Sequence, residues 1–161
     1  MSIERAREYL GQFGYADRIR EFSVSSATVE LAAQALGCEP ERIAKSLTFH
    51  MGDGCVLIVA AGDAKVDNAG FKRQFGCKAK MLSFEEVEAM TGHAVGGVCP
   101  FGLEDGVTVY LDESLKRFKS VFPACGSSNS VMELSIEELE KLSGTAGWVD
   151  VCKGWRSEEA E

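Results

Sequence analysis

The sequence lacks the short motifs that mark the commonest catalytic sites. It contains no GxGxxG for a dinucleotide, no GxxxxGKS or GxxxxGKT for a triphosphate, no HExxH and no GxSxG nucleophile elbow. Only His50 and His93 are available as histidine bases or ligands, and none of the six cysteines belongs to a CxxC pair. These absences argue against a metal site of familiar spacing and against a disulfide scaffold. We therefore expect free thiols, no cofactor and no metal.

Long apolar runs and a positive net charge are also missing. No run approaches the length of a membrane span, and the first residues carry charges where a signal peptide needs an apolar core, so we expect a cytoplasmic protein without a membrane partner. The net charge of −8 repels nucleic acid at long range, so no DNA partner is expected and any RNA contact must be local. Two basic groups interrupt this acidic background, and solvated helix faces are the favoured interpretation of both. They are Lys65, Lys72, Arg73, Lys78 and Lys80, and Lys116, Arg117 and Lys119.

The 161 residues suffice for one domain with its own hydrophobic core. Periodicity and capping predict helices over residues 2–13, 28–37, 40–43, 67–75, 83–90, 113–118 and 135–144, and strands over 20–25, 44–51, 55–61, 78–82, 107–111, 120–124, 131–134 and 148–152. No repeat or linker divides the chain, so we expect one domain over residues 1–155 and an acidic tail over 156–161. The pattern indicates an α/β fold with a mixed, mostly antiparallel sheet of about six or seven strands surrounded by short helices.

Residues 91–102, Thr-Gly-His-Ala-Val-Gly-Gly-Val-Cys-Pro-Phe-Gly, form a segment that we call the glycine loop. Glycine lets a ligand approach the main chain without meeting a Cβ atom, and exposed amides in such a loop can bind a carbonyl or phosphate oxygen. An ordinary connection between a helix and a strand is an equal alternative. Cys99 is the candidate nucleophile here, but no obvious base accompanies it. His93 is the candidate base, but a loop residue without a catalytic role is the favoured interpretation.

Lys45 lies where a short helix starting at Pro40 meets the first strand of a predicted hairpin, among mainly apolar neighbours. A lysine in this position can direct its ammonium into a cleft beside the sheet and stabilise a carbonyl oxygen or a phosphate. Taken alone, a lysine that extends to the rim of the cleft is the simpler interpretation. The residue types therefore suggest chemistry at Lys45 only if other features converge on it.

Together these two regions resemble the YbaK/EbsC family. The resemblance rests on residues 28–47, which contain Ala35-Leu36-Gly37, Pro40 and Ile43-Ala44-Lys45-Ser46-Leu47, and on residues 92–102 of the glycine loop. The match spans nearly the whole chain, in order and at fitting spacing. Members of this family are freestanding aminoacyl-tRNA deacylases similar to the editing domain inserted in bacterial prolyl-tRNA synthetases.

The resemblance implies hydrolysis of the ester between a wrong amino acid and the terminal adenosine of a tRNA. The expected partner is aminoacyl-tRNA, above all tRNA-Pro carrying alanine or cysteine, with an aminoacyl-tRNA synthetase as an optional second partner. By position, Lys45 is the essential lysine that holds the substrate's carbonyl or terminal phosphate region. Gly96 and Gly97 belong to the loop whose amides stabilise the developing oxyanion. The residues expected to bind substrate are His93, Cys99, Pro100, Phe101, Gly102 and Gly126. No protein nucleophile is implied, because water, the neighbouring ribose hydroxyl or a substrate thiol attacks.

Two departures from the family pattern leave the substrate open. Cys99 stands where the family loop often has serine, and the turn Ala124–Asn129 lacks the basic residue that the family commonly carries there. An alternative function also stays open, namely a non-catalytic module that uses the same pocket to bind a tRNA end, a nucleotide or a synthetase.

Overall fold

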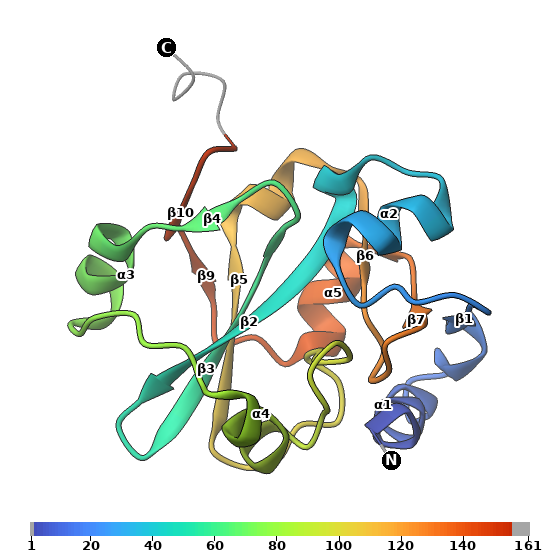
Figure 1. Ribbon diagram of the computed structural model, residues 1–161, viewed down its shortest axis with the longest axis horizontal. Coiled ribbons are helices and arrows are strands. Elements are labelled where there is room, and N and C mark those ends of the chain that lie inside the picture. Colours follow the sequence, from blue (N-terminus) through green and yellow to red (C-terminus); the bar gives the residue numbers. More distant parts are fainter. Residues whose placement is uncertain (1, 156–161) are drawn as a thin grey trace.

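A curved six-stranded sheet with the strand order β8-β6-β2-β3-β5-β9 lies at the centre of the protein (Figure 1). The computed structural model describes residues 2–155, and the acidic tail expected over residues 156–161 lies outside them. The strands of this sheet are β2 (Ile43–Met51), β3 (Gly54–Ala61), β5 (Val107–Asp112), β6 (Ser120–Pro123), β8 (Leu134–Ser135) and β9 (Trp148–Val149). Two small antiparallel pairs flank it: β1 (Arg20–Glu21) with β7 (Ser130–Val131), and β4 (Lys65–Val66) with β10 (Cys152–Lys153).

The β2–β3 hairpin organises this sheet. Its register runs from the pair Ala44–Ala61 to the pair Met51–Gly54, and β3 is buried along nearly its whole length, as its uninterrupted apolar sequence predicts. Crossover connections then place β6 parallel to β2, and β5 and β9 in parallel beyond β3. The predicted α/β fold with a mixed sheet is confirmed. Among the described strands, four of the seven pairings are antiparallel, whereas three of the five inside the central sheet are parallel because these crossovers intervene.

Five α-helices and three 3-10 helices surround the sheet in the described part of the chain. The α-helices are α1 (Ser2–Gly11), α2 (Val29–Leu36), α3 (Asn68–Phe75), α4 (Phe84–Thr91) and α5 (Ile136–Ser143), and the 3-10 helices are η1 (Ala16–Arg18), η2 (Pro40–Arg42) and η3 (Glu113–Arg117). Both predicted capping boxes are present, Ser83 with Glu86 at α4 and Ser135 with Glu138 at α5. The ends of the helices are therefore set by local sequence.

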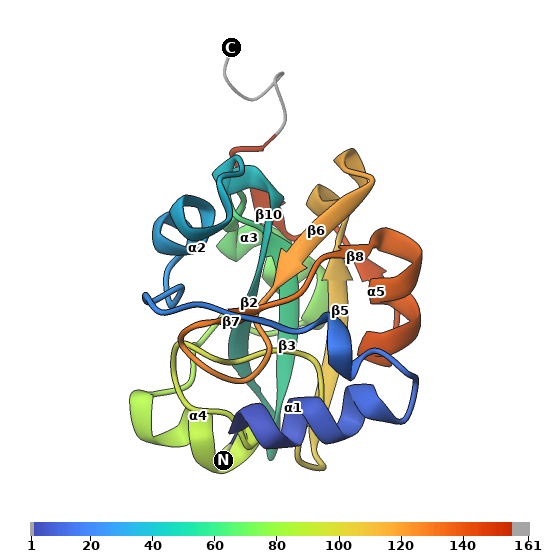
Figure 2. The same ribbon diagram turned by 90° about the vertical axis from the view of Figure 1, so that its right-hand side faces the viewer.

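The helices cover different sides of the sheet. Figure 2 shows α2 and α4 on one side and α5 on the other. Phe71 and Phe75 of α3 pack against the sheet, because the Phe71 ring contacts Phe49 of β2 in a tilted arrangement and Phe75 meets Tyr110 of β5 edge to face. The α1 helix is tied to α5 through the Tyr9 hydroxyl, which donates to the Leu142 carbonyl at 2.6 Å. This arrangement leaves one edge of β2 accessible between α2 and α4.

Several predicted strands are shorter than expected. Residues 78–82 form only a one-pair bridge, Met81 with Phe49, so a strand there is wrong. The segment 148–152 is divided into β9 and the start of β10. Between them, the Val151 amide donates a hydrogen bond of 3.0 Å to the Asp112 carboxylate, which directs the chain away from the sheet. Similarly, residues 131–134 divide between β7 and β8. Each of these segments is fixed by a distant partner, which local sequence does not reveal.

Candidate functional site

A cavity of about 280 Å³ lies along the outer edge of β2, the edge that faces away from β3. Residues 43–48 of β2 form its floor, and residues 26–29 with Ala32 enclose it from the side of α2. Val87 of α4, together with Val95, Gly96 and Val98 of the glycine loop, closes the opposite side. The cavity is lined mostly by apolar side chains with a few polar groups, the composition usual for a small-molecule site.

The cavity exists because the outer edge of β2 is only partly paired. β6 pairs with residues 43 and 44 alone, and the segment before α4 returns to β2 at residues 48–50, where the Leu82 amide donates to the Thr48 carbonyl. Between these two contacts, the described residues pair no strand with the outer edge of residues 45–47, whose inner edge pairs with β3. We call this stretch the open edge. It brings Lys45, Ser46 and Leu47 to the cavity together, although side chains on a strand alternate between faces.

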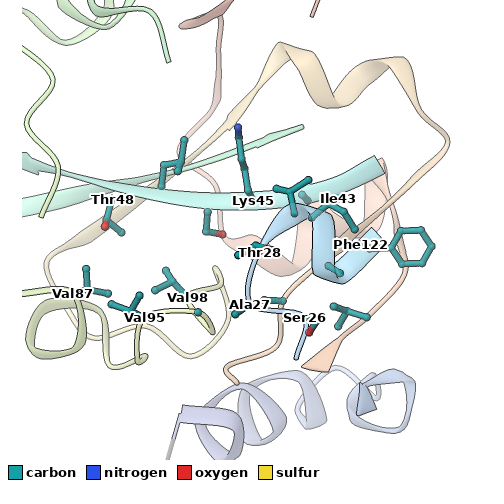
Figure 3. Close-up of a pocket in the computed structure, with 18 of the residues that line it drawn as sticks. Ser26, Ala27, Thr28, Ile43, Lys45, Thr48, Val87, Val95, Val98 and Phe122 are labelled. Atoms are coloured by element: carbon teal, nitrogen blue, oxygen red, sulfur yellow. The ribbon is translucent and has the colours of Figure 1, made fainter. Parts of the chain in front are cut away.

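Lys45 lines the cavity and extends from β2 on the side opposite to Thr48, Val95 and Val98 (Figure 3). Its Nζ lies 3.4 Å from the Gly62 carbonyl, and no carboxylate of the described residues forms an ion pair with it. Burial therefore lowers the pKa of Lys45, and the nearby charges of Asp63 and Glu30 only partly offset this effect. A half-buried ammonium without a carboxylate partner is well suited to receive a negatively charged or polar ligand group.

Ser46 contributes a hydroxyl that the described residues leave unsatisfied. Its Oγ is buried and has no hydrogen-bond partner, whereas the nearby Thr28 Oγ1 is occupied because it accepts from the Leu31 amide at 3.1 Å. A buried hydroxyl that lacks a partner costs free energy unless a ligand or water supplies one. Ser46 is therefore the polar group of the cavity wall most in need of a partner.

Two adjacent glycines bring the glycine loop against its surroundings. Gly96 lines the cavity with φ +94°, and a Cβ there would lie 3.3 Å from the Cβ of Ala27. Gly97 lies behind it, where a Cβ would come within 2.7 Å of three backbone atoms of Gly126 and Ser127. The loop and the turn at Gly126 are thus in direct main-chain contact, which only glycine permits at position 97.

The other predicted loop residues lie behind the cavity. Gly102 accepts from the Arg5 Nε at 2.9 Å and packs on the backbone of α1, whereas Pro100 is buried. His93, Cys99 and Phe101 are fully buried and do not line the cavity. The His93 Nε2 lies 2.7 Å from the Phe101 carbonyl and 3.5 Å from the Cys99 Sγ. These three side chains pack together beneath the loop and have no exposed surface that could contact a substrate. Direct substrate binding by them stays a prediction, and the geometry does not favour it.

Cys99 is also unsuited to act as a nucleophile. Burial raises the pKa of its thiol to about 12, so the thiolate is scarce at neutral pH. If the chain hydrolyses aminoacyl-tRNA as the resemblance implies, Cys99→Ser should keep turnover within about twofold of the original protein, because the new hydroxyl retains His93 and the Phe101 carbonyl as partners. Steady-state deacylation kinetics, with circular dichroism as the check on folding, measure this. A folded variant without turnover would contradict the assignment and point to thiol chemistry.

The grouping of possible metal ligands and the character of the helices bear on other classes of site. Among residues 2–155, no group of three or more histidine, cysteine or acidic side chains is arranged to hold a metal ion. Within the same residues, no helix has both the length and the apolar character needed to cross a membrane.

Comparison with known protein families shows what this chain is similar to. The family model described as the aminoacyl-tRNA editing domain matches residues 24–142, a range that contains Lys45, the open edge and the whole glycine loop. The chain belongs to the aminoacyl-tRNA editing domain family. The resemblance deduced from residues 28–47 and 92–102 is thereby confirmed.

Individual relatives place this editing domain more closely. It is 54% identical over 156 residues to the uncharacterized protein YwhH of Bacillus subtilis, covering 96% of this chain and 99% of the relative. It is 29% identical to EbsC of Enterococcus faecalis, named a candidate Cys-tRNA(Pro)/Cys-tRNA(Cys) deacylase, over 76% of both chains. A crystal structure of a candidate trans-editing enzyme for prolyl-tRNA synthetase superimposes with a TM-score of 0.85 and 32% identity, over 95% of this chain and 98% of the other.

The editing domain also matches part of a synthetase. It is 31% identical to the proline–tRNA ligase of Shouchella clausii over 64% of this chain, but over only 18% of the ligase. The same fold unit is therefore found as a segment of a much longer enzyme in that relative.

Sequence reasoning identified some residues of this editing-domain cavity and missed others. It singled out Lys45 and Gly96, which the structure brings to the cavity, and it missed Ser46, Thr48, Val87 and Val95. Alternation along β2 would have shown that Ser46 and Thr48 share a face. The contribution of Val87 and Val95 depends on how α4 and the glycine loop fold back over β2, for which no local signal exists.

Proposed function

We propose that this editing domain is a cytoplasmic trans-editing hydrolase that deacylates mischarged aminoacyl-tRNA, with tRNA-Pro carrying a small amino acid such as alanine or cysteine as its substrate. The observation that carries the proposal is the cavity that contains both Lys45 and Gly96 in a chain of this family. The family resemblance supplies the reaction, and the cavity supplies a place for the ester.

The chemistry that we propose needs orientation more than a protein nucleophile. An aminoacyl ester is already activated, so holding it beside water or the neighbouring ribose hydroxyl in a water-poor site lowers the barrier substantially. The Lys45 ammonium would stabilise the substrate's carbonyl or its terminal phosphate region, and the amides around Gly96 and Gly97 would stabilise the oxyanion. The absence of an ion-pair partner for Lys45 among the described residues supports this role, because its charge is available to a ligand.

Lys45 and the glycine loop approach the substrate from different sides. They flank the open edge of β2 and do not face each other across the cavity (Figure 3). A substrate that used both would cross the open edge, with the aminoacyl group and the terminal adenosine on either side of it. This division would let one end of the site read the amino acid and the other hold the nucleotide.

The size and polarity of the cavity support a small amino acid. Its volume of about 280 Å³ is below the usual range for drug-sized ligands, and valine side chains narrow it at positions 29, 87, 95 and 98. Such a pocket excludes large residues by sterics but separates side chains that differ by one methylene only weakly. The unsatisfied Ser46 hydroxyl would suit a substrate that presents a polar atom at the wall.

The purified protein should be assayed against a panel of mischarged tRNAs, including alanyl-, cysteinyl- and seryl-tRNA-Pro, with prolyl-tRNA-Pro as the cognate control. We expect release of at least one small amino acid at least about tenfold faster than proline, because the pocket is narrow. A protein that bound these tRNAs but protected their esters would instead be the non-catalytic module. Addition of prolyl-tRNA synthetase to the same assay tests whether a synthetase partner is needed.

A further inference from the structure

An exposed apolar strip leads from the cavity to the surface beside α4. Met81 lines the cavity and is nevertheless 58% exposed, and Phe84 is 74% exposed, the most of any large hydrophobic residue in the described chain. A phenylalanine this exposed has a large apolar surface in contact with water and is a candidate for a binding surface. We call Lys78, Lys80, Met81 and Phe84 the exposed rim.

The exposed rim is held in a fixed position. Leu82, between its two apolar members, is buried against Cys55 and Val87, and the Lys80 carbonyl accepts from the His50 amide at 2.8 Å. The capping box at Ser83 then sets the start of α4. Phe84 precedes Val87 by three positions, so the two side chains neighbour each other on the helix and continue the apolar surface out of the cavity.

The charge of the rim is opposite to that of the whole molecule. The ammonium groups of Lys78 and Lys80 are exposed, and no described carboxylate forms an ion pair with either one. Lys72 and Arg73, in the last turn of α3, add two more exposed cations on the same connection. Of the acids on α4, Glu86 is engaged by His50 and by the Ser83 amide, whereas Glu85 and Glu88 are exposed. In a chain of net charge −8, Lys78 and Lys80 are thus a local pair of cations beside Met81, which lines the cavity.

We propose that the exposed rim binds the unpaired 3′ end of the tRNA, with a base upstream of the terminal adenosine stacked on Phe84 and the backbone phosphates beside Lys78 and Lys80. Aromatic faces with flanking cations are the combination that binds single-stranded nucleic acid without requiring a particular sequence. The inference rests on the proposed function, because it assumes that the aminoacylated end occupies the cavity. It adds a surface that binds the nucleotides before that end and so offsets the repulsion between RNA and a protein of net charge −8.

The first test compares Phe84→Ala, Phe84→Leu and Phe84→Trp in deacylation of a mischarged tRNA. Phe84→Ala should raise KM about tenfold with kcat unchanged, Phe84→Trp should retain the original KM, and Phe84→Leu should resemble Phe84→Ala because it lacks an aromatic face. Phe13→Ala, at another exposed phenylalanine in the turn after α1, is the matched control and should leave KM unchanged. An unchanged KM in Phe84→Ala would overturn the proposal.

A minimal substrate separates the rim from the cavity. An aminoacyl ester of adenosine alone has no upstream nucleotides, so the Phe84 variants should hydrolyse it at the original rate. An equal loss on this substrate and on tRNA would mean that Phe84 shapes the cavity, which overturns the rim as a nucleotide site.

A measurement of RNA binding without hydrolysis tests the rim separately from the proposed function. A fluorescent, uncharged RNA ending in CCA should bind the original protein more tightly than Phe84→Ala, whether or not the protein hydrolyses esters. The paired variant Lys78→Glu with Lys80→Glu should weaken binding and flatten its dependence on salt, whereas Lys141→Glu on α5 should not. The rim variants could instead keep the original affinity for RNA and lose affinity for prolyl-tRNA synthetase. That result would assign this surface to a protein partner and overturn the proposal.

Discussion

Replacing Lys45 by methionine should abolish deacylation and leave the protein folded. Lys45 is the one cationic residue among those that line the cavity, and methionine keeps an unbranched side chain of similar length while removing the charge. Loss of a preorganised electrostatic contact to a developing charge typically costs about 10²–10³-fold in rate. Single-turnover deacylation of a mischarged tRNA measures the loss, since it reports the chemical step without product release.

The stability of the Lys45→Met variant should equal or exceed that of the original protein. Burial lowers the pKa of Lys45 in the folded chain below its ordinary value, so folding disfavours the protonated form. Stability linked to this group is therefore reduced at pH values below the lowered pKa and recovers as the pH rises through it. Methionine removes the buried charge altogether, and thermal unfolding at neutral pH should show no loss in Tm.

Lys141→Met is the matched control for charge, because Lys141 is exposed on α5 on the side of the sheet away from α2 and α4 (Figure 2). It should retain full activity. Full activity in Lys45→Met would show that the ammonium takes no part in the reaction, and the proposed chemistry would then have to rest on the glycine loop alone.

Local signals accounted for the elements that are set by neighbouring residues. The capping boxes at Ser83 and Ser135, the left-handed glycine that ends α2 at Gly37, and the hairpin between β2 and β3 all depend on residues within a few positions of one another. The same is true of β3, whose continuous apolar run marks it as central. These parts of the fold could be read directly from the chain.

The remaining parts depend on contacts between distant segments. Residues 78–82 have the composition of a strand, yet only Met81 pairs, because β2 offers that segment a short length of its outer edge. The open edge itself arises from where β6 stops and where the segment before α4 begins, and neither boundary is encoded near Lys45 or Ser46. The cavity was therefore predictable in its residue types but not in its geometry.

The glycine loop shows the same division between chemistry and packing. From composition, His93 and Cys99 are the reactive members, but both are buried under the loop and contact Phe101 instead of the cavity. The glycines, which carry no side-chain chemistry, determine where the loop lies. Gly97 is the clearest case, because backbone atoms of Gly126 and Ser127 leave no room for a Cβ atom at position 97.

Gly97→Ala should therefore both destabilise the protein and impair its function. The added Cβ would lie 2.5 Å from the Gly126 carbonyl carbon and 2.6 Å from the Ser127 nitrogen, and backbone atoms cannot rotate aside as a flexible side chain can. Forcing the loop away should cost about 1–3 kcal/mol of folding free energy and move Gly96 from the cavity. Thermal or urea unfolding measures the first effect, and deacylation at a temperature where the variant is folded measures the second.

Gly11→Ala provides the control for adding a methyl group without a clash, since its Cβ would meet only the Ala16 Cβ at 3.9 Å. It should leave activity unchanged and stability unchanged or slightly higher, because alanine is the better helix former. If Gly97→Ala were as stable as Gly11→Ala, the tight contact between the loop and the Gly126 turn would be disproved. If it were destabilised but fully active when folded, the loop would be structural, and the oxyanion would have to be stabilised from the Lys45 side of the open edge.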